Sequence, residues 1–205
     1  CVYLTYRVSR VYADPTAALT KSSRLASTMN QPEEGKQKAP ELEGGVEWLN
    51  CGGPIRLKDL RGKIVLLDFW TYCCINCIHT VPDLARLEKK YPNELVVIGV
   101  HSAKFDGEKD SKNIKDAILR YHIEHPVVND AAHRIWDAYD VSSWPTLALI
   151  DPEGNYLGSA SGEGNYELLD RIIAKLKNIG TICLTNTTTQ AFFGIDYDLH
   201  DYSPK

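Results

Sequence analysis

Two cysteines three residues apart, Cys74 and Cys77, stand where an apolar run ends and an amphipathic stretch begins. The run at 64–69 is apolar except for Asp68, which indicates a central strand covered on both faces. From Cys74 to about Lys90, apolar residues recur every three positions, which indicates a helix. Two cysteines three apart at the start of a helix can bring their sulfurs within bonding distance. The pattern therefore restricts the chain to folds that present a dithiol between a buried strand and a helix.

The rest of the sequence alternates strand-like and helix-like segments. The residues at 151–155, Asp-Pro-Glu-Gly-Asn, are typical of a β-hairpin turn. Crossover connections predict that the first strands run parallel. The order predicts an α/β fold, with a central mixed sheet and helices on both faces. The further expected strands are 95–100, 127–128, 146–150 and 156–160, and the further expected helices are 111–121, 131–139 and 166–177.

Composition divides the 205 residues into one domain and two flanking segments. Apolar residues make up 43% and charged residues 24%, which is typical of a soluble globular domain. We expect this domain at 45–178. A disordered or targeting-like segment and linker is expected at 1–44, and a tail without a predictable structure at 179–205. The first 30 residues carry four basic side chains and one acidic one and resemble an organellar transit peptide.

Neither nucleic acid nor a membrane is an expected partner. The net charge is -4, which provides no strong attraction to nucleic acid. No apolar run approaches the roughly 18 residues that indicate a transmembrane helix.

Three of the six cysteines, Cys73, Cys74 and Cys77, lie within five residues of one another. A disulfide scaffold spreads its cysteines to close loops, so this cluster indicates redox chemistry, with metal binding as the other option. Unpaired N–H groups at a helix N-terminus favour a thiolate, so we expect the pKa of Cys74 to fall below the free value of about 8.5. Cys77, one turn further on, is expected to be more buried and to resolve a mixed disulfide.

Several of these residues resemble a known family. The segment 69–77 is similar to the active-site segment of thioredoxins. Asp68 stands where thioredoxins have a buried carboxylate, and Pro82 matches the proline of their active-site helix. The Trp-Pro-Thr sequence at 144–146 resembles their cis-proline turn. The resemblance implies a thioredoxin fold.

Further segments narrow the resemblance. Residues 57–63 and an αβ insertion at 102–128 resemble the TlpA/ResA-like subgroup, which is used in cytochrome c maturation and related redox reactions. Residues 71–79 and 99–105 resemble the thioredoxin-like domain of the NHL-repeat-containing protein 2 family. Full-length members carry a C-terminal NHL β-propeller that is absent here, so we expect a truncated chain. The family implies the cytosol, and the transit-like first residues give an organelle as the alternative.

The resemblance also implies a role for each site residue. Cys74 attacks a partner disulfide, Cys77 resolves the mixed disulfide, and Asp68 accepts the proton of Cys77. A cis bond at Pro145 presents the preceding backbone to a substrate strand. The expected substrate-binding residues are Trp144, Pro145 and Thr146.

Two departures from thioredoxin bear on the chemistry. Cys73 replaces the tryptophan that usually precedes the nucleophile, and the Ile-Asn pair at 75–76 replaces Gly-Pro. Cys73 is a candidate accessory thiol, which would form a second disulfide or tune Cys74, although a bystander role is favoured.

Three functions stay open at this point. The first is a thiol–disulfide oxidoreductase that acts on protein disulfides or with a reductase and needs no cofactor. The second is a non-catalytic interaction domain. The third is a copper-handling protein, because Cys73 and Cys77 have the spacing of thioredoxin-fold copper chaperones, with His133 as a candidate distal ligand. The oxidoreductase is the favoured interpretation, and it predicts no metal site.

Overall fold

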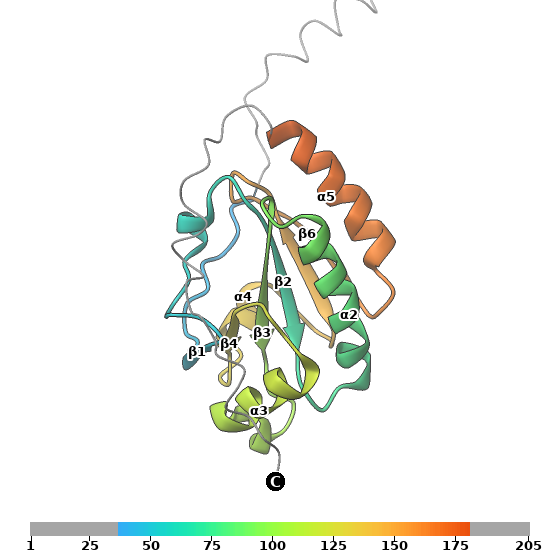
Figure 1. The fold of residues 1–205 in the computed structure, drawn as a ribbon. Coiled ribbons are helices and arrows are strands. Elements are labelled where there is room, and N and C mark those ends of the chain that lie inside the picture. The colour runs from blue at the N-terminus through green and yellow to red at the C-terminus, as the bar shows by residue number, and fades with distance from the viewer. Residues whose placement is uncertain (1–36, 181–205) are drawn as a thin grey trace, which may run out of the picture. The chain divides into compact units, whose positions relative to one another are not determined.

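A six-stranded mixed sheet runs through residues 37–180, the part of the chain that the computed structural model describes (Figure 1). The spatial order of the strands is β1-β4-β3-β2-β5-β6. The central strand, β2, pairs in parallel with β3 and antiparallel with β5. The expectations for 1–36 and 181–205 lie outside the described residues. The strands are β1 (Glu47–Leu49), β2 (Ile64–Trp70), β3 (Leu95–His101), β4 (Val127–Asn129), β5 (Thr146–Ile150) and β6 (Tyr156–Ser161).

Helices cover both faces of this sheet. Alternate residues of β2 point to opposite faces. Ile64 and Leu66 pack with apolar residues of α2 and α5, whereas Val65 and Leu67 pack with those of α4. The predicted α/β fold, with a mixed sheet between two helical layers, is confirmed. The helices are α2 (Ile75–Lys90), α3 (Ser111–Tyr121), α4 (Arg134–Ala138) and α5 (Tyr166–Gly180), with short 3-10 helices η2 (Leu57–Leu60) and η3 (Asp106–Lys109).

The central strand and the helix after it position the dithiol. All seven residues of β2 are buried, which requires neighbours on both edges and both faces. α2 buries Cys77, Val81, Leu84 and Leu87, the stripe that the apolar spacing predicts apart from the half-buried Ile78. No helix within residues 37–180 has both the length and the apolar character needed to cross a bilayer.

The ordered domain begins earlier than the sequence predicts. Residues 37–44 are expected to be part of a linker, yet they contact the domain. The Glu41 carboxylate accepts hydrogen bonds from the backbone N–H groups of Leu57 (2.9 Å) and Lys58 (3.1 Å). Leu42 is 7% exposed and belongs to the core. A single apolar residue among Pro, Glu and Gly gives no periodic signal, so its burial is visible only in three dimensions.

Candidate active site

The dithiol lies at the N-terminus of α2. Cys74 is the N-cap residue, with an extended backbone (φ −98°, ψ 109°), and its carbonyl accepts a 3.2 Å hydrogen bond from the Ile78 N–H. Cys74 is half-buried, Cys77 is fully buried and Cys73 is exposed. Within residues 37–180, these three cysteines and Cys51 are free thiols. One thiol is thus accessible at the helix end, and a second lies one turn inside.

Two buried acids, a thiol and a carboxyl group, lie beneath this helix end. Burial raises the pKa of the Cys77 thiol far above its usual range, and Cys74 and Asp68 act in the same direction. Asp68 is 2% exposed, and burial raises its pKa to about 7, although the positive charge that His125 can carry opposes this shift. The Cys77 thiol is therefore protonated near neutral pH, whereas Asp68 exchanges a proton in that range, and the charge of Asp68 makes ionisation of Cys77 less favourable.

A buried glutamate holds the loop between β2 and the dithiol. Glu108, in η3, is 1% exposed. Its Oε1 accepts hydrogen bonds from the Thr71 hydroxyl and from the Cys73 N–H (3.1 Å). Its Oε2 accepts from the backbone N–H groups of Lys104 (2.9 Å) and Phe105 (2.8 Å). Burial raises the pKa of Glu108, but these hydrogen bonds outweigh it and leave the pKa below its usual value.

The carboxylate of Glu108 also affects Cys73. Partial burial raises the pKa of the Cys73 thiol, and Glu108 adds to this through a hydrogen bond and its negative charge. Cys73 is therefore less readily ionised than a free cysteine. Sequence reasoning missed Glu108, because it follows a glycine in a short polar segment and its partners are 35 and 37 residues away.

His101 completes the support of this loop. It is fully buried at the end of β3, between the rings of Trp70 (centroids 5.0 Å apart) and Tyr72 (5.3 Å). Its Nε2 accepts a long hydrogen bond from the Tyr72 N–H (3.4 Å). Burial lowers the pKa of His101 to about 4, although Glu108 opposes this shift, so the ring is neutral at pH 7.

The proline turn lies beside the dithiol. The Trp144–Pro145 peptide bond is cis. Trp144 is half-buried, and it packs against the apolar cluster that contains Cys77, with Cys74 at its border. Its indole N–H donates to the Ser102 carbonyl (3.0 Å), and its ring lies 4.3 Å from that of Trp136. Trp144 thus packs against the same apolar cluster as Cys74 and also contacts the ring of Trp136.

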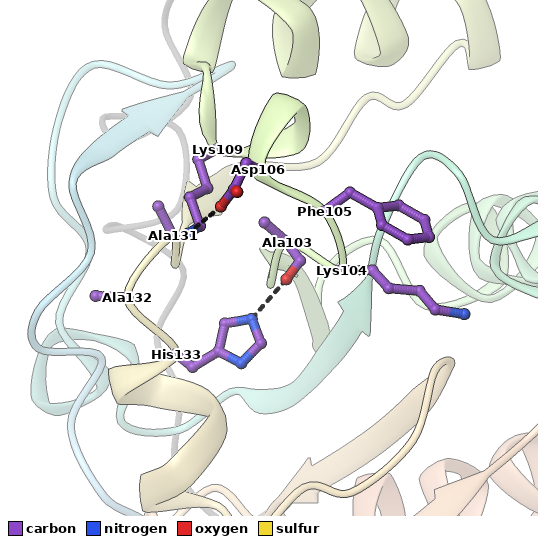
Figure 2. A pocket seen from close by; sticks show the side chains of 8 residues that line it. All are labelled: Ala103, Lys104, Phe105, Asp106, Lys109, Ala131, Ala132 and His133. Carbon is purple, nitrogen blue, oxygen red and sulfur yellow. Dashed lines mark hydrogen bonds and ion pairs between the residues drawn. The ribbon is translucent and has the colours of Figure 1, made fainter.

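Figure 2 shows a pocket of about 500 Å³ lined in part by His133, whose ring lies 6.2 Å from that of Trp144. Figure 2 shows that Lys104 and Phe105 extend to one side, away from His133. The Lys104 ammonium group lies 5.7 Å from the centroid of the Phe105 ring and 6.0 Å from that of Trp144. A cation and an exposed aromatic ring therefore border the proline turn. The pocket is lined by Ala103, Lys104, Phe105, Asp106, Lys109, Ala131, Ala132 and His133.

His133, considered above as a copper ligand, has another partner. Its Nε2 lies 2.8 Å from the Ala103 carbonyl oxygen, which fixes Nε2 as the donor (Figure 2). The residues between 37 and 180 contain no group of three or more His, Cys, Asp or Glu side chains placed to hold a metal ion. The structure thus brings Asp68, Cys77 and Cys74 together and leaves His133 engaged elsewhere.

A helix that begins at a dithiol, follows the central strand of a mixed sheet and lies beside a cis-proline turn defines a thioredoxin-fold redox domain. The sequence profile described as thioredoxin-like matches residues 62–156. Thiol-disulfide oxidoreductase ResA of Bacillus cereus (strain ZK / E33L) is 32% identical over 125 residues, which cover 61% of this chain and 70% of that protein. The chain belongs to the thioredoxin-like family.

Longer proteins are also similar to this chain. NHL repeat-containing protein 2 of Gallus gallus is 57% identical over 133 residues, which cover 63% of this chain and 18% of that protein. The protein named SUPPRESSOR OF QUENCHING 1, chloroplastic, of Arabidopsis thaliana is 44% identical over 196 residues, which cover 85% of this chain and 19% of that protein. The chain thus spans about a fifth of the length of these curated relatives, and the resemblance to the NHL-repeat family is confirmed.

Solved structures show the same fold. The solution structure of a thioredoxin-like protein in the oxidized form has a TM-score of 0.63 and 26% identity, and the match covers 70% of this chain and 97% of that one. A putative thiol:disulfide interchange protein DsbE from Chlorobium tepidum has a TM-score of 0.60 and 26% identity, over 70% and 98% of the two chains. The predicted thioredoxin fold is confirmed.

Proposed function

We propose that this chain is a thiol–disulfide oxidoreductase that acts on protein disulfides through Cys74 and Cys77. The Cys74 thiolate attacks one sulfur of the partner disulfide, and the other partner sulfur leaves as a thiolate. Cys77 then gives its proton to Asp68 and attacks the Cys74 sulfur of the mixed disulfide. A Cys74–Cys77 disulfide forms and the second partner thiolate is released, so the partner gains the two electrons that the dithiol loses.

One observation carries the proposal: a half-buried thiol stands at the N-cap position of α2, while a buried thiol one turn further on is close enough to a buried carboxyl group for its charge to affect the pKa of the thiol. Unpaired N–H groups at a helix N-terminus favour an anion in general, and Cys74 occupies this position in α2. The pKa of Asp68, raised by burial to about 7, suits a group that takes up and releases a proton near neutral pH. A pair of merely structural cysteines has no need of such a carboxyl group.

We assign substrate binding to Trp144, Pro145 and Thr146. Proline lacks an N–H group, so the Pro145 turn leaves the Trp144 backbone open to an extended substrate segment. The Thr146 hydroxyl lies within hydrogen-bonding distance of the Ser143 carbonyl and the Ser161 hydroxyl, both at 2.8 Å, which supports the turn from beneath. The half-buried Trp144 ring provides an apolar contact beside the thiols.

The test is to trap the mixed disulfide. We expect the Cys77→Ser variant to retain a disulfide-bonded partner on Cys74 when it is mixed with oxidised insulin or a small disulfide. The mixed disulfide persists because the resolving thiol is missing. The Cys74→Ser variant should trap nothing, and Cys51→Ser, which changes a half-buried cysteine outside the site, should turn over like the wild type. A Cys77→Ser protein that captures no disulfide over pH 6–9 would instead support a non-catalytic interaction domain.

We propose an organelle as the location. The chloroplastic relative aligns with 85% of this chain, and residues 1–30 have a basic, Ser- and Thr-rich composition. Fusion of residues 1–36 to a fluorescent protein tests this proposal, with the arginines at 7, 10 and 24 changed to glutamate as the control. Diffuse cytosolic fluorescence from the unchanged segment would favour the cytosol.

A further inference from the structure

Unpartnered polar atoms lie beneath the dithiol. Asp68 Oδ1, Trp70 Nε1 and His125 Nε2 are buried and have no hydrogen-bond partner among the described residues. Asp68 pairs with Gly99 in the register of β2 and β3. A Cβ atom on Gly99 would lie 3.0 Å from Trp70 Nε1 and 3.6 Å from His125 Cδ2. The missing side chain at Gly99 therefore lets both rings lie against β3 next to Asp68.

His125 lies between the buried Asp68 side chain and the protein surface. It lies between α3 and β4 and is 4% exposed. Its Nδ1 is 3.4 Å from Oε2 of Glu88, whose side chain is 27% exposed on α2. If Nδ1 carries the ring proton and donates it to the Glu88 carboxylate, Nε2 keeps a lone pair that faces the interior. One imidazole thus has a basic nitrogen inside the protein and an acidic N–H near solvent.

Few other titratable groups face this path. α2 provides Cys77 and Glu88, and the segment before β4 provides His125. The contacts from α3 and β5 are apolar, from Ile114, Ala117 and Leu147. His101 lies against the other end of Trp70 and is neutral at pH 7.

We propose that His125 and Glu88 form a proton relay between Asp68 and solvent, which carries the proton away from Asp68 as Cys77 gives it up in the resolving step. This inference rests on the proposed function. Asp68, protonated by Cys77 in the resolving step, gives its proton to His125 Nε2, a transfer that one bridging water molecule can carry. The Nδ1 proton passes to Glu88, which releases it to water. Asp68 keeps its carboxylate charge, and His125 is neutral before and after the transfer, with its proton moved from Nδ1 to Nε2. When the disulfide is reduced again, a proton moves inward by the same steps and restores the Nδ1–H form. The relay neither adds nor removes electrons.

The relay explains two features that a single buried acid does not. Every residue of β2, the strand that carries Asp68, is buried, so a proton on Asp68 has no direct route to solvent. A proton taken up at Nε2 while another leaves Nδ1 also keeps the imidazole of His125 neutral during the transfer. His125 and Glu88 are accordingly positioning residues, because neither contacts the reacting sulfurs.

The resolving step can be measured alone by stopped flow. At saturating small disulfide, the second phase of the reaction of the reduced full chain is independent of disulfide concentration and reports the attack of Cys77 on the mixed disulfide. We expect Glu88→Gln to slow this phase about tenfold at pH 7 and to leave the first, concentration-dependent phase unchanged, since general acid–base steps contribute ~10²-fold or more. Glu88→Asp should restore part of the rate.

Controls separate the relay from a structural effect. Glu124→Gln and His122→Gln change exposed groups of the same segment and should match the wild type. His125→Asn should slow the second phase like Glu88→Gln, and the half-exposed Glu88 still tests the relay if the His125 variant fails to fold. A wild-type second phase in Glu88→Gln over pH 5–9, or the same slowing at every pH, would overturn the relay. Capture of a disulfide by Cys77→Ser would in that case still support the dithiol function.

Discussion

At the scale of single residues, burial and hydrogen bonding decide how readily each group of the site ionises. Desolvation disfavours the charged form of each buried group, so it raises the pKa values of Asp68 and Cys77 and lowers that of His101. Glu108, equally inaccessible, has the opposite shift because four donors surround its carboxylate. Hydrogen bonding to the charged form, rather than burial alone, therefore decides which acid is ionised.

Asp68→Asn should stabilise the reduced protein at alkaline pH. The pKa of Asp68 is raised to about 7 in the folded state, so the folded chain binds a proton that the unfolded chain has released. The contribution of Asp68 to the free energy of unfolding is therefore lost as the pH rises from the pKa of Asp68 in the unfolded chain through its pKa of about 7 in the folded chain. The loss is as much as roughly 4 kcal/mol. We expect the gain from Asp68→Asn in urea unfolding to be larger at pH 8 than at pH 4. An equal difference between the two proteins at both pH values would contradict the raised pKa.

At the scale of elements, a short 3-10 helix fixes the loop that carries Cys73. Glu108 of η3 joins the end of β2 to the segment after β3 through one carboxylate. Glu108→Gln has one acceptor oxygen in place of two and leaves buried N–H groups unpaired. We expect a loss of about 2 kcal/mol in the free energy of unfolding at pH 7. Asp106→Asn, which changes an exposed carboxylate of the same element, is the control. An equal loss in both variants would mean that the loop contacts contribute nothing.

The segment after β3 should also select substrates by charge. The Lys104 ammonium group lies near the rings of Phe105 and Trp144, beside the proline turn. We expect Lys104→Glu to slow the reaction with an anionic aromatic disulfide about fivefold and to accelerate the reaction with cystamine, since unit charges about 4 Å apart in water interact by ~1 kcal/mol. Both changes should fade in 0.5 M salt. Lys89→Glu, about 20 Å along α2 from the dithiol, should change neither rate. Equal effects on both disulfides would contradict selection by charge.

At the scale of the whole molecule, the sequence predicts features that depend on local patterns and misses those that depend on long-range contacts. The helix Ser111–Tyr121 is predicted to its ends, because its apolar spacing is a local signal, and the structure adds an Asp110 side chain that caps its first turn. β1 is missed, since three residues pair only with β4, about 80 positions away. The spacing of Cys74 and Cys77 is a local signal, and the resemblance to thioredoxins adds Asp68, whereas Glu108 and His125 come close to these residues only through the fold.

The last prediction at this scale concerns residues 37–44. Leu42 packs in the core on the α4 face, and the neighbouring backbone joins the β5–β6 hairpin through the Ala39 N–H and the Gly154 carbonyl (3.1 Å). In the full chain, Leu42→Ala should lower the free energy of unfolding by about 2–3 kcal/mol, as a buried leucine does when a cavity replaces it. Val46→Ala, at a position that is 66% exposed, is the matched control and should cost less than about 0.5 kcal/mol. If chemical denaturation gives the same small loss for both variants, residues 37–44 are a linker, as their composition predicts. If only Leu42→Ala is destabilised, the domain needs these residues to close its core.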